Sequence, residues 1–130
     1  DADNVSFTLM TMNTHPAHFD YEFAKKTEFG KPLVCSPLTV ALMVGMSVSD
    51  CSQKAVANLG WDKIRLTHPL FPGDTLYAES EVLDKRESNS RPEQGIVTVR
   101  TIGKNQHGDV VRTFERTTLI WKRGFGPVDD

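Results

Sequence analysis

An uncharged segment over residues 32–49 most constrains the fold, because its central part, 38–48, is apolar on nearly every face of a helix. Ser36 can cap such a helix and Pro37 suits its first turn, so the helix is predicted to begin there. A helix that is apolar all round has to be buried by other structure. Prolines and hydroxyl side chains make the segment a poor membrane span. We therefore expect a long central helix inside a folded domain.

Shorter helices and then strands surround this segment. Asp3 and Asp20 each suit the N-cap of a short helix before it. Alternation rich in β-branched residues predicts four later strands, over 56–66, 75–83, 96–102 and 110–122. Turn-forming residues and polar loops indicate hairpin-like links between consecutive strands, and hence an antiparallel sheet. Helices first and strands afterwards give an α+β domain whose sheet folds around the apolar helix.

Length and composition exclude several classes of protein. The 130 residues suit one domain over 1–130, and 38% apolar residues are too many for a disordered chain. A net charge of -2 gives no basic excess for binding nucleic acid. Two cysteines are too few for a disulfide framework, which favours a protein of the cytoplasm or an organelle matrix. The chain begins with Asp rather than Met, so further residues are expected to precede it.

The densest polar cluster is the segment 13–20, Asn-Thr-His-Pro-Ala-His-Phe-Asp, which separates two amphipathic helices. Polar side chains between apolar helices must be paired or hydrated, and a histidine there can exchange a proton near neutral pH. His18 is therefore a candidate acid or base, although it could instead only bond a backbone carbonyl. His15, His18 and Asp20 could also be read as metal ligands. Pro16 breaks the helical face that would align the histidines, so we predict no metal site.

The start of the central helix is a second candidate site, because unpaired amides and the positive end of the helix dipole meet there. A proline without an N–H follows Ser36, which leaves the amides of Ser36, Leu38 and Thr39 as donors toward a developing negative charge. Ser36 could alternatively be no more than an N-cap. A thiol at a helix start can become nucleophilic, but we interpret Cys35 and Cys51 as small buried apolar side chains.

The same residues resemble the MaoC-like hydratase/dehydratase family, whose members include (R)-specific enoyl-CoA hydratases and adopt the hotdog fold. The family motif has an Asp, a variable residue, Asn-Pro-Leu-His, one residue and an Asp, followed by a Phe and a Pro before a His-Gly helix start. Segment 13–20 is similar, and Phe29, Pro32 and Cys35-Ser36 follow it without insertion or deletion. Phe-Pro-Gly-Asp-Thr-Leu over 71–76 also resembles the family's turn-and-strand signature.

The resemblance implies a hotdog domain in which an antiparallel sheet wraps the central helix. It also implies a hydratase that acts on CoA thioesters and needs no cofactor. His18 falls at the family's catalytic histidine, and Ser36 at the residue whose backbone amide binds the thioester carbonyl. The resemblance further implies that another strand precedes the first helix. Two such domains are expected to pair their sheets edge to edge, as a homodimer or a larger homo-oligomer.

Three signature positions differ from the family motif. Asn13 stands where the family has its catalytic Asp, and an amide can orient water but cannot exchange a proton. His15 replaces an Asn, and Cys35-Ser36 replaces His-Gly. A subgroup related to mesaconyl-CoA hydratases carries a similar Met-Asn-Thr-x-Pro stretch. This likeness implies a branched dicarboxylyl-CoA substrate such as mesaconyl-CoA or β-methylmalyl-CoA.

A free carboxylate on such a substrate needs a cationic partner. His15 or an arginine that reaches the pocket is a candidate, and Cys35 is a further residue expected to line it. Arg86 and Arg91, which flank the polar loop 88–95, could equally meet the phosphates of CoA.

Two other functions stay open from the sequence. A hotdog thioesterase would use the same helix start with a carboxylate near the thioester, and Glu22 or Glu28 would have to supply it. Loss of the family Asp could instead mark a non-catalytic subunit that only binds acyl-CoA, because a fold does not fix a function.

Overall fold

The computed structural model describes residues 1–127, and these form helices first and strands afterwards. The helical part consists of α1 (Ala2–Met10), η1 (Pro16–His18), α2 (Tyr21–Ala24), α3 (Ser36–Met46) and the π-helical turn η2 (Val48–Ser52). The sheet consists of β1 (Ala55–Leu66), β2 (Tyr77–Glu87), β3 (Gln94–Lys104) and β4 (Val110–Trp121). The predicted α+β class and the predicted antiparallel sheet are confirmed.

The strand order is β1-β4-β3-β2, so the first and second strands are the two edges of the sheet. Hairpins join β2 to β3 and β3 to β4, as predicted. The prediction of a hairpin-like link between β1 and β2 is wrong, because these strands are not neighbours in the sheet. The connection 67–76 instead crosses from one edge to the other. The Val34 amide donates to the Leu70 carbonyl at 2.8 Å, and both side chains pack with Val111 in the core. These contacts hold the crossover against the segment that leads into α3.

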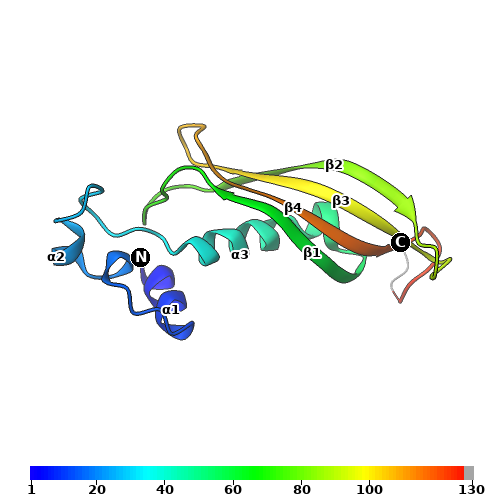
Figure 1. Cartoon of the computed structure of the whole chain (residues 1–130), viewed down its shortest axis with the longest axis horizontal. Coiled ribbons are helices and arrows are strands. Elements are labelled where there is room, and N and C mark those ends of the chain that lie inside the picture. The colour runs from blue at the N-terminus through cyan, green and yellow to red at the C-terminus, as the bar shows by residue number, and fades with distance from the viewer. Residues whose placement is uncertain (128–130) are drawn as a thin grey trace.

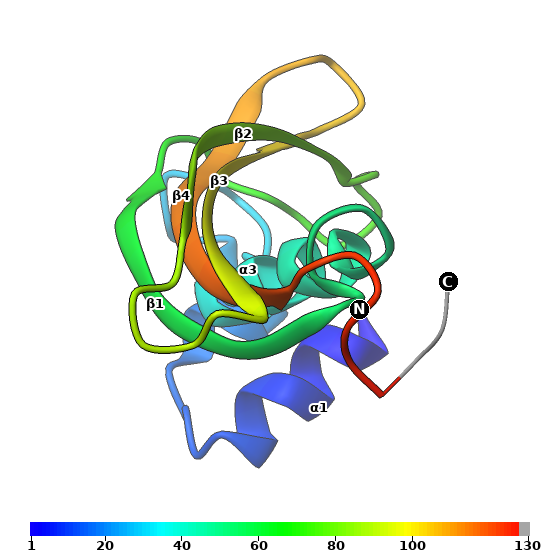
Figure 2. The same cartoon turned by 90° about the vertical axis from the view of Figure 1, so that its right-hand side faces the viewer.

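Helix α3 lies along the concave side of the sheet, which curves around it (Figures 1 and 2). The buried positions of the helix are Thr39 and Met43, four residues apart, and the C-cap residue Ser47 continues this stripe. Gly103 on β3 permits this close approach, because a Cβ atom there would lie 2.7 Å from the Met43 sulfur. The prediction that the sheet folds around the apolar helix is confirmed for this side of α3.

The opposite side of α3 is apolar and exposed. Leu42 and Met46 are 47% and 44% exposed, and Trp61 and Leu66 on the edge strand β1 are 43% and 58% exposed. An open groove of about 610 Å³ runs between α3 and β1. Among residues 1–127, no helix is long and apolar enough to cross a membrane. The sheet of a single chain thus covers only part of the central helix.

The helix starts differ in part from the prediction. Asp20 caps α2 as predicted, accepting from the Phe23 amide at 3.0 Å. The prediction of Asp3 as the cap of α1 is wrong, because the Asp1 carbonyl already accepts from Val5 and the helix begins earlier. Ser36 is likewise not an N-cap: it is the first residue of α3, and its hydroxyl bonds a distant side chain instead.

Candidate active site

His18 ends the short helix η1, and its ring is fixed by one hydrogen bond. Its Nδ1 lies 3.0 Å from the Leu33 carbonyl oxygen. A carbonyl can only accept, so Nδ1 carries a proton, and in the neutral form of the ring Nε2 is the nitrogen that can accept one. Nε2 has no hydrogen-bond partner among residues 1–127. The carbonyl bond weighed as an alternative in the sequence is therefore present, and it orients the ring for accepting a proton.

A buried asparagine of α1 holds this arrangement together. Asn4 is 3% exposed, and its Nδ2 donates to the carbonyls of His18 at 3.0 Å and Leu33 at 3.1 Å. Its Oδ1 accepts from the Cys35 amide at 2.8 Å. The Asn4 side chain therefore connects three backbone groups. They are the His18 carbonyl, the Leu33 carbonyl that accepts from the His18 ring, and the amide of Cys35, the residue before α3. Sequence reasoning missed Asn4, because its partners are distant in the chain.

We expect Asn4→Asp to destabilise the protein by about 2–4 kcal/mol at pH 7, because a carboxylate cannot donate to the two carbonyls and would repel them. Burial among carbonyl oxygens raises the pKa of the introduced carboxyl above the unfolded value. The penalty should therefore be small at pH 3–4 and grow as the pH rises through that pKa. Urea unfolding against pH measures this effect. Asn89→Asp, in an exposed loop, is the matched control, and equal behaviour of both variants would contradict the role of Asn4.

The first turn of α3 presents unpaired amides. The Thr39 amide bonds the Cys35 carbonyl at 3.2 Å, so the predicted role of Thr39 as a donor to a ligand is wrong. Pro37 has no N–H. The amides of Ser36 and Leu38 donate to no acceptor among residues 1–127. Two free donors at the positive end of a helix can stabilise a negatively charged oxygen.

A cavity of about 260 Å³ brings the histidine and the helix start together. His18 and Ser36 both line it, with Leu33 between them in the chain and with part of the crossover connection on the other side. Its remaining walls are mostly apolar, apart from Thr67, His68 and Arg112. The two candidate features from separate parts of the sequence thus face one space.

Asn13 and His15 lie beside this cavity without lining it. Asn13 Oδ1 accepts from the His15 amide at 3.0 Å, and its Nδ2 points to the Cys35 sulfur at 3.9 Å. The exposed His15 ring caps η1 by accepting from Ala17, and it packs on the rings of His18 and Phe23 at about 6 Å. Both residues therefore shape the segment that carries His18.

The other predicted site residues lie apart from the cavity. Cys35 is 1% exposed and Cys51 is partly buried, so both are core or near-core thiols, and neither is in a disulfide. Arg86, near the end of β2, and Arg91, in the β2–β3 turn, are both exposed. This turn lies at the opposite end of the sheet from α1 and α2 (Figure 1). Among residues 1–127, no group of three or more His, Cys, Asp or Glu side chains could hold a metal ion.

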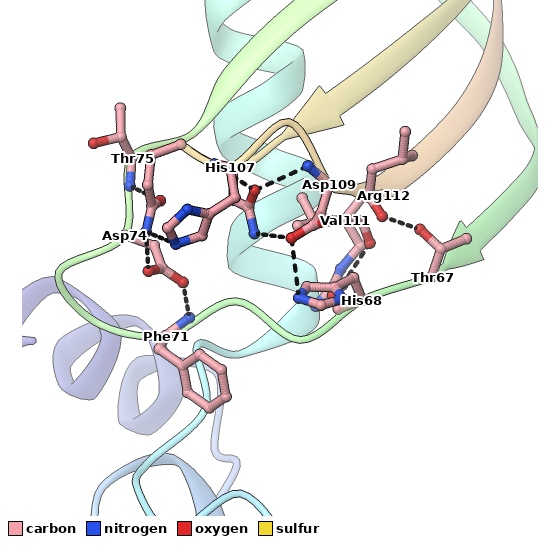
Figure 3. Close-up of polar contacts among 12 residues, drawn as sticks. Thr67, His68, Phe71, Asp74, Thr75, His107, Asp109, Val111 and Arg112 are labelled. Carbon is pink, nitrogen blue, oxygen red and sulfur yellow. Dashed lines mark hydrogen bonds and ion pairs between the residues drawn. The ribbon is translucent and has the colours of Figure 1, made fainter.

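Two cavity residues were not indicated by the sequence. They are His68 of the crossover connection and Arg112 of β4. The Arg112 guanidinium donates to the His68 carbonyl at 2.6 Å, and His68 Nε2 lies 3.7 Å from an Asp109 carboxylate oxygen. Figure 3 shows these residues in one polar cluster between the crossover and the β3–β4 hairpin. The sequence contained no spacing signal for Arg112, because its partners are distant in the chain.

Asp74 fastens the same connection to the hairpin tip. Its carboxylate accepts from the Phe71 amide at 2.9 Å and from the Gln106 amide group at 2.8 Å (Figure 3). Burial opposes ionisation, but these two bonds and the nearby charges of Lys31 and His107 outweigh it and lower the pKa of Asp74 below its usual 3.8. A lowered pKa contributes stability that is complete above the unfolded value and is lost as the pH falls through the folded one.

We therefore expect Asp74→Asn to lower stability by about 1–2 kcal/mol at pH 6, since the amide keeps one acceptor but loses the charge-assisted bonds. The difference from the unchanged protein should shrink as the pH falls below the unfolded value and through the lowered pKa of Asp74, because protonation removes the charge-assisted bonds. Urea unfolding at pH 6 and pH 3 measures both values. A difference that stays constant with pH would show that the charge is not what stabilises the turn.

Several known proteins are similar in sequence. Residues 1–105 match the family described as MaoC like domain. A mesaconyl-CoA hydratase of Cereibacter sphaeroides is 42% identical over 102 residues, which are 78% of this chain and 29% of the relative. A β-methylmalyl-CoA dehydratase of Chloroflexus aurantiacus is 34% identical over 78% of this chain and 28% of its own length. An (R)-specific enoyl-CoA hydratase of Aeromonas caviae is 30% identical over 92% of this chain and 84% of its own length. The chain thus spans about three tenths of the first two relatives.

Solved structures show the same architecture. A putative MaoC domain dehydratase from Chloroflexus aurantiacus superposes with a TM-score of 0.88 at 28% identity, covering 99% of this chain and 37% of that chain. A Mycobacterium tuberculosis protein with a double hotdog fold superposes with a TM-score of 0.74 at 22% identity, covering 88% of this chain and 37% of that chain. The central helix and its curved sheet are therefore the hotdog architecture.

Proposed function

The chain belongs to the MaoC-like domain family, and on that premise we propose that it adds water to an enoyl-CoA thioester, or removes it from a 3-hydroxyacyl-CoA. The observation that carries this proposal is the cavity in which His18 meets the start of α3. An unprotonated ring nitrogen and free amides are the two groups that hydration of a thioester needs.

The proposed reaction uses His18 first as a base and then as an acid, and it uses the Ser36 amide as a hydrogen-bond donor. His18 Nε2 takes a proton from a water molecule as its oxygen bonds the β-carbon of the enoyl group. The electron pair of the carbon–carbon double bond moves toward the thioester carbonyl, and the Ser36 amide stabilises the enolate oxygen. The proton on His18 is then available for the α-carbon, which gives the 3-hydroxyacyl thioester. Dehydration follows the same steps in reverse.

We propose that Asn13 orients the attacking water in place of the family Asp. Its Oδ1 accepts from the His15 amide and its Nδ2 approaches the Cys35 sulfur, which holds it beside η1. The second lone pair of the amide oxygen can accept from water without ionising. His18 would then be the only proton-transferring side chain of the pair.

Asn13→Asp tests this role of the asparagine. A second titrating group should change the shape of the pH profile of kcat/KM and alter the rate by about tenfold, rather than abolish it. The profile is measured over pH 5–9 on an accepted substrate. A rate that falls by the same factor at every pH would contradict the role, because it would mark only a structural disturbance.

The names of the relatives suggest which thioesters to try first. We propose mesaconyl-CoA and β-methylmalyl-CoA as the substrate pair, since relatives with those activities are 42% and 34% identical. The β-carbon of mesaconyl-CoA carries a carboxylate, so the acyl group is short, branched and anionic. The reaction is proposed to require no cofactor beyond the CoA of the substrate.

A thioesterase is less well supported by the structure. Glu22 has an 80% exposed side chain paired with Lys25, and neither Glu22 nor Glu28 lines the cavity.

Cysteines outside any disulfide fit a cytoplasmic or organelle-matrix location. The exposed apolar side of α3 and the open edge of β1 support a homodimer or larger homo-oligomer, which would cover both.

A panel of CoA thioesters separates these functions. We expect mass spectrometry to detect the gain or loss of one water molecule, and a thiol-reactive dye to detect no free CoA. Release of CoA without hydration would instead support the thioesterase. Tight binding of acyl-CoA with no turnover of any enoyl or hydroxyacyl thioester would support the non-catalytic subunit.

A further inference from the structure

Arg112 is a buried cation without an anionic partner. Its side chain extends from β4 toward the start of α3, and the residue is 4% exposed. Nη1 donates to the carbonyls of His68 at 2.6 Å and Val111 at 2.7 Å, and Nη2 donates to the Ser36 hydroxyl at 3.3 Å. Nε is buried and has no partner. All of these acceptors are neutral, and no carboxylate among residues 1–127 lies within 4.0 Å of the guanidinium.

This position is unfavourable for an isolated positive charge. Burial removes the hydration of the guanidinium, and the start of α3 adds the positive end of a helix dipole. Asp109 is the nearby acid that faces the crossover, but its carboxylate contacts His68 and Asn105 rather than Arg112. Charges are normally buried only with a partner. The missing partner is therefore expected to come with a ligand.

Arg112 lines the same cavity as His18 and Ser36, and its guanidinium bonds the Ser36 hydroxyl. A ligand whose thioester oxygen meets the Ser36 amide has its acyl group, not its phosphates, in this space, because the pantetheine arm separates the phosphates of CoA from the thioester. The anion that Arg112 meets must therefore belong to the acyl group itself. A carboxylate suits the planar fork of an arginine, which can donate two parallel hydrogen bonds to it.

We propose that Arg112 binds a free carboxylate on the acyl group and so selects dicarboxylyl-CoA substrates over uncharged ones. This inference rests on the proposed hydration of enoyl-CoA thioesters and names the residue that determines its specificity. The Ser36 hydroxyl positions the guanidinium, so the same residue offers its amide to the thioester and its side chain to the selecting cation. Among the arginines weighed from the sequence, Arg86 and Arg91 have no part in this site.

The fold provides a matched control in Arg116. It lies on the same strand, is 2% exposed and likewise donates to a serine hydroxyl, Ser47 Oγ at 3.1 Å. It faces the other end of α3 and does not line the cavity. Any general effect of removing a buried arginine from β4 should therefore be seen in both Arg112→Met and Arg116→Met.

The test compares mesaconyl-CoA with tiglyl-CoA, which has a methyl group in place of the carboxylate. We expect Arg112→Met to lower kcat/KM for mesaconyl-CoA by about 100-fold and to change that for tiglyl-CoA less than threefold. Arg116→Met should leave the ratio of the two values unchanged, and Arg112→Lys should restore part of it. An equal loss on both substrates, or an unchanged ratio in Arg112→Met, would overturn the proposal.

A binding measurement covers the case in which tiglyl-CoA is too slow to assay. Succinyl-CoA and butyryl-CoA have four-carbon saturated acyl groups that differ in the same way. We expect Arg112→Met to weaken binding of succinyl-CoA selectively, and equal weakening of both ligands would overturn the proposal. If the unchanged protein hydrates no enoyl-CoA but still prefers succinyl-CoA through Arg112, only the proposed hydration fails.

Discussion

His18→Asn should lower kcat/KM for hydration by about 10³-fold, the usual size of the loss when a general base is removed. The asparagine amide can still donate to the Leu33 carbonyl from nearly the place of Nδ1, but it offers no nitrogen that takes a proton. The fold around η1 should therefore be kept while the reaction is lost. Thioester absorbance on an accepted substrate measures the rate, and urea unfolding measures the stability.

Two further variants define what this loss means. His18→Ala removes both the base and the bond to Leu33, so its activity should be as low and its stability lower than in His18→Asn. His107→Asn, at the exposed tip of the β3–β4 hairpin, is the same substitution away from the cavity and should keep the normal rate. If His18→Asn retained more than a third of the rate, His18 would be a structural residue and the proposed mechanism would be wrong.

The parts of the site that could be predicted are those with local signals. An apolar run marked α3, and alternation of β-branched residues marked the four strands, with ends correct to within a few residues. His18 was predicted as a candidate acid or base because it lies in the polar segment 13–20, which separates two amphipathic helices. Such patterns depend only on near neighbours in the chain, so they can be recognised without knowledge of the tertiary structure.

The residues that could not be predicted act through distant contacts. Asn4 bonds a residue 31 positions away, and Arg112 bonds one 76 positions away. Neither distance leaves a mark in residue spacing, since each contact exists only after the crossover 67–76 and α1 have packed around the start of α3. The pairing of β1 with β4 has the same cause. Periodicity indicates that a strand exists but not which strand it pairs with.

Ser36→Pro should lower kcat/KM by about 10²–10³-fold, because it deletes the backbone donor that we assign to the enolate oxygen. Proline has no N–H, and its ring is tolerated in the first turn of a helix. The preceding residue already has the extended conformation that a proline requires, since Cys35 has φ -59° and ψ 127°. The helix should therefore form normally while one amide of the candidate oxyanion site disappears.

Ser36→Ala separates the amide from the hydroxyl, since it keeps the N–H and removes only the acceptor of Arg112. We expect it to lose less than tenfold in rate, and to lose more on a carboxylated substrate than on an uncharged one. Ser36→Pro removes the N–H as well as the hydroxyl, so it should slow both substrates by a much larger factor than Ser36→Ala does, because the thioester oxygen is common to them. If both variants were equally slow on an uncharged thioester and equally stable, the hydroxyl rather than the amide would be the functional group. The start of α3 would then not be the oxyanion site.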